Sequence, residues 1–123
     1  MKPTLDESQP IFQQIAQMIK DDIVDGRLQE NEKIASTTEL SRFYNINRAT
    51  AQKGLQSLVE TGIVMKKRGV GMFVNEGAKA ILLKERQENF YDEFIAPLLD
   101  EANRINLKED QLIDLIMRGK KND

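Results

Sequence analysis

The chain has 123 residues, of which 40% are hydrophobic and 31% charged, with a formal net charge of −2 and neither Cys nor His. This length suits one domain, or a small domain with an appendage, and the missing Cys and His exclude disulfides, thiol catalysis, His-based catalysis and the usual zinc sites. The longest apolar run, Ala80–Leu83, is far shorter than the ~20 residues that a membrane span needs. No apolar segment follows Lys2, so we expect no secretory signal and a cytoplasmic protein. We also expect that the protein needs no cofactor.

Positive charge gathers in the middle of the chain. Residues 42–68 hold six basic groups against one acidic group, a net charge of +5, whereas the segments on either side are net acidic. A local basic patch can attract a polyanion even when the whole chain is slightly acidic. The alternative is chance clustering of charges on a solvated surface.

A first helix is predicted from Pro10 to just before Gly26. Proline suits the first position of a helix, and glycine suits the left-handed residue that ends one. Isoleucines recur at every fourth position and define an apolar face: Ile11, Ile15, Ile19 and Ile23. The opposite face carries Asp21, Asp22 and Asp25, so this helix is interpreted as scaffold and not as a DNA-facing surface.

A second, short helix is predicted to begin after Ser36. The spacing of Ser36 and Glu39 is that of a capping box, and Leu40 and Phe43 are predicted to form the buried side. A tight turn at residues 44–47, with Ile46 buried, then leads to a third helix.

The third helix is predicted to begin after Asn47 and to end near Thr61, before Gly62. Together with the second helix it has helix-turn-helix proportions. A helical wheel places the buried seam at Ala51, Leu55, Leu58 and Val59. The exposed face carries Ala49, Gln52, Lys53 and Gln56. Amides and long cations are the groups that read base edges, and Arg48 in the first turn is placed to reach a phosphate.

A β-hairpin is predicted from two short apolar segments, residues 63–65 and 72–74. Between them lie the basic run Lys66, Lys67, Arg68 and the glycines Gly69 and Gly71. A glycine-flanked tip lets the backbone approach a phosphate or enter a minor groove. Such a turn is a weak signal alone, but directly after a helix-turn-helix it indicates the wing of a winged helix.

The C-terminal part, residues 77–123, has helical spacing and is predicted to be a separate domain after a DNA-binding domain at residues 1–76. Pro97 either kinks one long helix or restarts it, and a final helix is predicted over residues 109–118, ended by Gly119 and followed by a frayed tail. Two helices of this length cannot bury their apolar residues alone, so they pack on the first domain or on a second copy. The residues predicted to form a dimer surface are Phe90, Tyr91, Phe94, Ile95, Leu98, Leu112, Ile113 and Ile116. The acidic pairs at residues 92–93 and 100–101 are interpreted as solvated, and no metal site is expected.

Residues 10–74 resemble the DNA-binding domain of the GntR family of bacterial transcription regulators. The matching segments are PIFQQI (10–15), GRL (26–28), IASTTEL (34–40), INRAT (46–50), LQSL (55–58), GIV (62–64) and GVGMFV (69–74). The short C-terminal part is similar to that of the YtrA subfamily. The resemblance implies a fold that is mainly α with a small β-hairpin: an N-terminal winged helix-turn-helix and a short two-helix C-terminal dimerisation domain.

The resemblance also implies which residues touch DNA. By position these are Ser36, Thr37, Thr38, Asn47, Arg48, Ala49, Thr50, Gln52, Lys53, Arg68, Gly69 and Gly71. The family often has Pro where Ala35 stands and Arg where Thr38 and Gln52 stand, so its operator preference does not carry over. Gln52 is expected to favour an adenine.

The function expected from the resemblance is that of a homodimeric repressor of a transporter-type operon, bound to a pseudo-palindromic double-stranded DNA operator. Two alternatives come from other classes: a winged-helix module that binds protein or RNA, and a small enzyme. The polar, basic face of the third helix disfavours the first, and the lack of His, Cys and a paired catalytic set disfavours the second. The sequence identifies no small-molecule effector and leaves open whether one exists.

Overall fold

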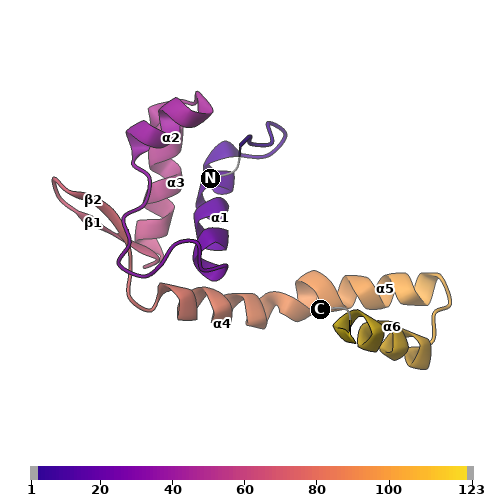
Figure 1. Cartoon of the computed structure of the whole chain (residues 1–123). Coiled ribbons are helices and arrows are strands. Elements are labelled where there is room, and N and C mark those ends of the chain that lie inside the picture. Colours follow the sequence, from indigo (N-terminus) through magenta and orange to yellow (C-terminus); the bar gives the residue numbers. More distant parts are fainter. Residues whose placement is uncertain (1–2, 122–123) are drawn as a thin grey trace. The chain divides into compact units, whose positions relative to one another are not determined.

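The computed structural model describes residues 3–121, which form two compact units divided between Lys84 and Glu85 (Figure 1). As predicted, the chain is mainly α-helical with one small antiparallel hairpin. The elements are α1 (Ile11–Val24), α2 (Thr37–Tyr44), α3 (Arg48–Glu60), β1 (Val64–Lys67), β2 (Gly71–Val74), α4 (Ala78–Phe90), the π-helix η1 (Tyr91–Ile95), α5 (Ala96–Arg104) and α6 (Glu109–Lys121). The division lies within α4 because Ala78 and Leu82 are buried in the core of the first unit. The predicted functional boundary between residues 76 and 77 stays a prediction.

The first unit is built around one apolar core, to which α1, α2, α3, the hairpin and the first turns of α4 all contribute. Its largest fully buried side chains are Ile15, Ile23, Leu40, Leu55, Leu58, Ile63, Leu82, Val64 and Val74. Helix α1 packs against α3, and Gly54 of α3 lies against Phe12 and Ile15 of α1. A Cβ atom added to Gly54 would lie 2.8 Å from the carbonyl oxygen of Phe12, so only glycine fits this crossing without a shift.

The helix-turn-helix begins with the predicted capping box, which the structure confirms. The Glu39 N–H donates to Ser36 Oγ (3.1 Å), and the Ser36 N–H donates to Glu39 Oε1 (3.1 Å). These two bonds satisfy donors that the first turn of α2 would otherwise leave unpaired. The turn that follows contains Asn45 in the left-handed conformation, with φ of 53°, and Asn47 Oδ1 accepts the Ala49 N–H (2.8 Å) to cap α3.

The capping box gives a testable pH dependence. The hydrogen bonds from the backbone N–H and then the hydroxyl of Ser36 lower the pKa of Glu39. A carboxyl with a lower pKa in the folded state binds fewer protons there than in the unfolded chain, so its stabilising contribution is lost as the pH falls below about 4.5. In Glu39→Gln the amide oxygen still accepts the Ser36 N–H, and we expect a smaller loss of thermal stability between pH 5 and pH 3 than in the wild type. Thermal unfolding followed by circular dichroism measures this loss for both proteins, and an equal loss in Glu39→Gln and in the wild type would contradict the expectation.

The hairpin is longer than predicted and is joined by a third segment. Strands β1 and β2 pair in antiparallel register from Val64↔Val74 to Lys67↔Gly71. Residues 31–34 lie along the other edge of β2: the Ile34 N–H donates to the Met72 carbonyl (2.9 Å), and Lys33 forms a bridge with Phe73. The sequence of this segment, NEKI, has no apolar alternation, so its pairing with β2 was not predictable from the pattern.

In the second unit, α4, η1 and α5 follow one another without a break, so the chain stays helical through Pro97. Pro97 lies in the first turn of α5, and the preceding residues form η1, in which the Ala96 N–H donates to the Tyr91 carbonyl five residues earlier. Proline lacks an N–H, and its ring crowds the carbonyl four residues before it, here that of Glu93. The wider π-helical turn accommodates that carbonyl and lets the helix proceed.

The predicted end of the last helix at Gly119 is wrong, because α6 runs on to Lys121. Gly119 is not in the left-handed conformation that would end a helix. Arg118, Lys120 and Lys121 in the last turn interact favourably with the negative end of the helix dipole, which offsets part of the cost of a helical glycine. The rest of the predicted frayed tail, residues 122–123, lies outside the described residues.

Candidate nucleic-acid interface

Helix α3 presents two faces with different exposure. On the inner face, Ala51, Leu55 and Leu58 are fully buried, and Val59 is half-buried, as the helical wheel predicts. On the outer face, the predicted contact residues are exposed, apart from the half-buried Thr50: Arg48, Ala49, Gln52, Lys53 and Gln56. The exposed face therefore carries amides and cations and no carboxylate before Glu60.

A groove of about 320 Å³ lies in the first unit between the N-terminus of α2, the outer face of α3 and the hairpin. It is lined by Ser36, Thr37, Thr38, Gln52, Leu55, Gln56, Lys66, Lys67, Gly69, Val70, Gly71 and Met72. The groove brings together six of the residues that the resemblance implicates, from three separate segments. Apart from Leu55, Val70 and Met72, the lining offers hydroxyls, amides, ammonium groups and glycine backbone, which suit a polar, negatively charged ligand.

The other implicated residues lie outside the lining of this groove: Asn47, Arg48, Ala49, Thr50, Lys53 and Arg68. The side chain of Asn47 is used as the cap of α3. The Lys53 ammonium lies 4.0 Å from the centroid of the Phe12 ring on α1, a cation–π contact that directs it along the side of α3 toward α1. This direction suits contact with a phosphate at the edge of a groove better than contact with a base inside it.

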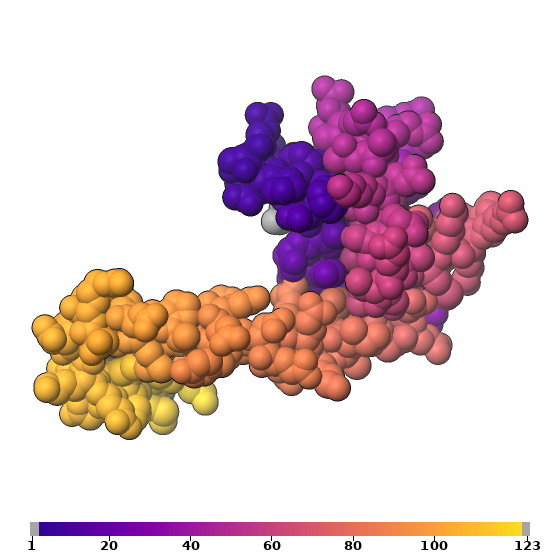
Figure 2. Space-filling view, turned by 180° about the vertical axis from the view of Figure 1, so that it is seen from behind, coloured from indigo at the N-terminus to yellow at the C-terminus, as the bar shows by residue number. Residues whose placement is uncertain are grey.

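The tip of the hairpin is exposed and basic. Gly69 and Gly71 have φ values of 77° and 145°, which side-chain-bearing residues rarely adopt, and the Val70 N–H closes the turn on the Lys67 carbonyl (2.9 Å). In the space-filling view the hairpin projects from the first unit beside α3 (Figure 2). Lys66, Lys67 and Arg68 are all exposed, and the Lys67 ammonium lies 4.5 Å from the centroid of the Phe73 ring.

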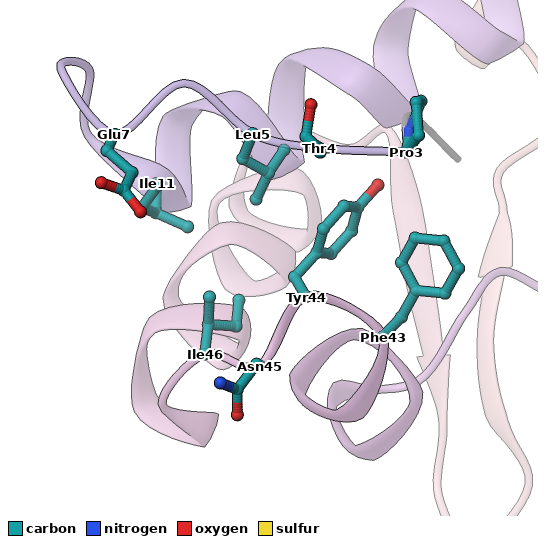
Figure 3. Close-up of a pocket in the computed structure, with 9 residues that line it drawn as sticks. All are labelled: Pro3, Thr4, Leu5, Glu7, Ile11, Phe43, Tyr44, Asn45 and Ile46. Atoms are coloured by element: carbon teal, nitrogen blue, oxygen red, sulfur yellow. The ribbon is translucent and has the colours of Figure 1, made fainter.

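A second hollow, of about 370 Å³, lies between the N-terminal segment and the end of α2, and it contains none of the predicted contact residues (Figure 3). Phe43, predicted to be buried, lines it and is 53% exposed, and Ile46 is only half-buried. Phe43 and Tyr44 lie three and four residues after Leu40, so either could continue the buried face of α2. Tyr44 is the one that points inward, and its hydroxyl donates to Met18 Sδ (3.1 Å). Burial raises the pKa of Tyr44, and the charge of Asp22 raises it further.

The second unit leaves most of its apolar side chains exposed. Within residues 85–121 only Ala102 is buried. Of the predicted dimer-surface residues, Ile95 and Leu112 are half-buried, and the others are more than one-third exposed: Phe90, Tyr91, Phe94, Leu98, Ile113 and Ile116. The rings of Phe90 and Phe94 lie 5.3 Å apart and form one aromatic surface across η1.

Two further observations concern residues 3–121. None of their helices combines the length and the apolar character that spanning a membrane requires. No group of three or more of their Asp and Glu side chains is placed to hold a metal ion.

Comparison with known proteins identifies a match over this same region. The family model for bacterial regulatory proteins of the gntR family matches residues 11–74. The HTH-type transcriptional repressor YtrA of Bacillus subtilis is 29% identical, with 94% of each chain covered. The uncharacterized HTH-type regulator YurK of the same organism is 37% identical over 67 residues, and this chain spans only 28% of its length.

Solved structures agree with these matches. A putative GntR-family transcriptional regulator from Bacteroides thetaiotaomicron is 26% identical, with a TM-score of 0.72, and the alignment covers 91% of this chain and 97% of that one. The DNA-binding domain of AraR, solved in complex with its operator ORE1, is 26% identical, with a TM-score of 0.51, over 60% of this chain and 93% of that one.

Proposed function

The chain belongs to the GntR family of bacterial regulatory proteins and is a DNA-binding transcription regulator, and from this premise we propose that it is a homodimeric repressor of a transporter-type operon. The observation that carries the proposal is the groove in which the outer face of α3, the N-terminus of α2 and the glycine-containing tip converge. Repression would follow from occupying an operator that polymerase needs. Such a regulator acts in the cytoplasm and performs no catalysis.

We infer a division of labour among the implicated residues. Helix α3 lies in a major groove, where Ala49, Gln52 and Gln56 contact base edges. Phosphates are bound by the remaining groups, which position the protein without reading sequence: Ser36, Thr37, Thr38, Asn47, Arg48, Thr50, Lys53, Arg68 and the backbone of Gly69 and Gly71. The direction of Lys53 toward Phe12 supports this division.

The partner that we propose for the second unit is a second copy of the chain. An isolated unit of this size does not bury enough apolar surface to be stable, and within residues 85–121 only Ala102 is buried. Pairing two copies through their aromatic surfaces would cover those side chains and would present two α3 helices to one DNA duplex. Two-fold symmetry in the protein then requires a pseudo-palindromic operator.

The test is a selection from a pool of random-sequence duplexes at a series of salt concentrations, with sequencing of the retained DNA. We expect a two-fold symmetric site and a binding constant that falls steeply with salt. Retention without sequence enrichment would indicate non-specific binding, and no retention at low salt would contradict the proposal and favour a module that binds protein.

The selected site also tests the role of Gln52. Because an amide can pair with adenine through two hydrogen bonds, we expect an adenine at one position of each half-site, and Gln52→Ala should lose preference there by roughly 5- to 100-fold. The matched control is Gln87→Ala, which removes an exposed glutamine from α4. A selected site with no adenine that depends on Gln52 would contradict the assignment.

A further inference from the structure

The segment that precedes α2 brings an additional lysine into the wing, which we define as residues 31–34 together with β1 and β2. Along this segment, the Asn31 N–H donates to the Val74 carbonyl (2.8 Å), and the Val74 N–H donates to the Glu32 carbonyl (2.9 Å). Lys33 is thereby paired with Phe73. Residues that pair across neighbouring strands have their side chains on the same face of the sheet, so Lys33 and Phe73 share a face.

The two faces of the wing differ in what they present. The inner face packs on the core through Ile34, Val64 and Val74, which are buried. The outer face carries Lys33 and Phe73. It also carries Lys67, because Lys67 lies two residues after Met65, the residue of β1 that pairs with Phe73. Lys67 lies over the Phe73 ring, so the two lysines flank one aromatic side chain.

Lys33 is directed along the wing toward its tip. A Cβ atom added to Gly71 would lie 2.7 Å from Lys33 Cε and 3.5 Å from Lys33 Nζ. The Lys33 stem therefore crosses the backbone of Gly71 and occupies the space that a side chain there would fill. The missing side chain at Gly71 gives the ammonium group a path toward the tip, beside the residues already assigned to DNA contact.

The charges of these lysines remain available to an anion. Across residues 3–121, the ion pairs of the structure involve neither Lys33 nor Lys67, and both side chains are exposed. Nearby carboxylates are engaged with the backbone: Glu32 accepts the Gln29 N–H (3.0 Å), Glu30 accepts the Gly77 N–H (2.9 Å), and Glu39 closes the capping box. The charge of Lys33 reaches Glu39 weakly, as the smallest of the causes that shift the pKa of that carboxyl.

We propose that Lys33 and Lys67 bind phosphates of the DNA backbone with the outer face of the wing, and that Phe73 is a positioning residue that holds Lys67 for this contact. The inference rests on the proposed function and adds a phosphate-binding pair that the sequence resemblance does not implicate. A cation–π contact restricts the rotamers of a lysine before it binds, which lowers the entropy lost on binding.

The test measures DNA affinity of the full chain at several salt concentrations, for the selected operator and for a scrambled duplex of equal length. For Lys33→Met and Lys67→Met we expect weaker binding to both duplexes by a similar factor, because phosphate contacts carry no sequence information. Because the proposed dimer carries two copies of each lysine, each variant should also make the negative slope of log K against log salt shallower by about 1.8. Lys79→Met, which removes an exposed lysine of α4, is the matched control and should keep the wild-type slope.

Positioning by Phe73 is tested by a double-mutant cycle. Phe73→Leu keeps an apolar side chain in the strand, and we expect it to weaken binding only while Lys67 is present, so that adding it to Lys67→Met has no further effect. Lys33→Arg should retain the wild-type slope, and thermal unfolding verifies that each variant is folded. Wild-type slopes in both Met variants would overturn this inference alone, and strictly additive effects would overturn the role of Phe73. Failure of the wild-type chain to bind DNA would overturn the proposed function, and this inference with it.

Discussion

The double variant Phe94→Glu/Ile116→Glu is expected to be a monomer and to lose at least 100-fold in affinity for the operator. Both side chains are about half exposed in the single chain and belong to the surface that we propose is covered by the second copy. Burying an unpaired carboxylate there is costly, so the dimer dissociates. A monomer binds one half-site at a time and loses the gain of roughly 10²- to 10⁴-fold that linkage of two sites provides. Light scattering should show a mass of 14.1 kDa in place of twice that value.

The matched control for this experiment places glutamate on a polar part of the same unit. Asn103 on α5 is exposed and polar, so Asn103→Glu should leave both the mass and the affinity unchanged. Circular dichroism verifies that the double variant keeps its helices, and residual binding to a single half-site verifies that the first unit is intact. A dimeric mass together with wild-type affinity would show that another surface joins the two copies.

The elements that could be predicted from the sequence are those whose signals are local. Ser36 and Glu39 specify a helix start within four residues, and Asn47 specifies the next one, because the hydrogen bonds of a cap involve near neighbours along the chain. The alternation of buried and exposed positions on α3 is local in the same sense. The face that carries Gln52 and Gln56 could therefore be identified before the fold was known.

The features that escaped prediction depend on contacts between distant segments or on a balance within one helix. Residues 31–34 lie extended along β2 only because its edge is there to pair with them, and Lys33 acquires its place in the wing only through that pairing. Phe43 and Tyr44 compete for one inward position, and the packing of Met18 on α1 decides in favour of Tyr44. The missing N–H donor of Pro97 is evident from the sequence, but the π-helical turn at η1 depends on the backbone conformation of the residues on both sides.

Substitution of Gly54 by Ala is expected to destabilise the first unit by about 1–3 kcal/mol, although alanine is the better helix former by ~1 kcal/mol. The added Cβ would meet the Phe12 carbonyl oxygen at 2.8 Å and the Ile15 side chain at 3.2 Å, and neither belongs to a flexible chain end. Helices α1 and α3 must then move apart, which loosens the core and shifts Lys53 relative to Phe12. Gly54→Val should have a larger effect, since it adds two more methyl groups at the same crossing.

Substitution of Gly119 by Ala separates the steric cost of the added Cβ atom from the gain in helix propensity. Gly119 also lies within a helix, but an added Cβ would have no atom within 4 Å in the described part of the chain. Gly119→Ala should therefore stabilise α6 by up to ~1 kcal/mol through helix propensity alone, with the opposite sign to Gly54→Ala. Urea unfolding followed by circular dichroism measures both free energies. If Gly54→Ala proves stabilising, α1 and α3 can separate at little cost, and the variant should also keep the wild-type DNA affinity. If the crossing is tight, Gly54→Ala should weaken DNA binding even under conditions where the variant is fully folded.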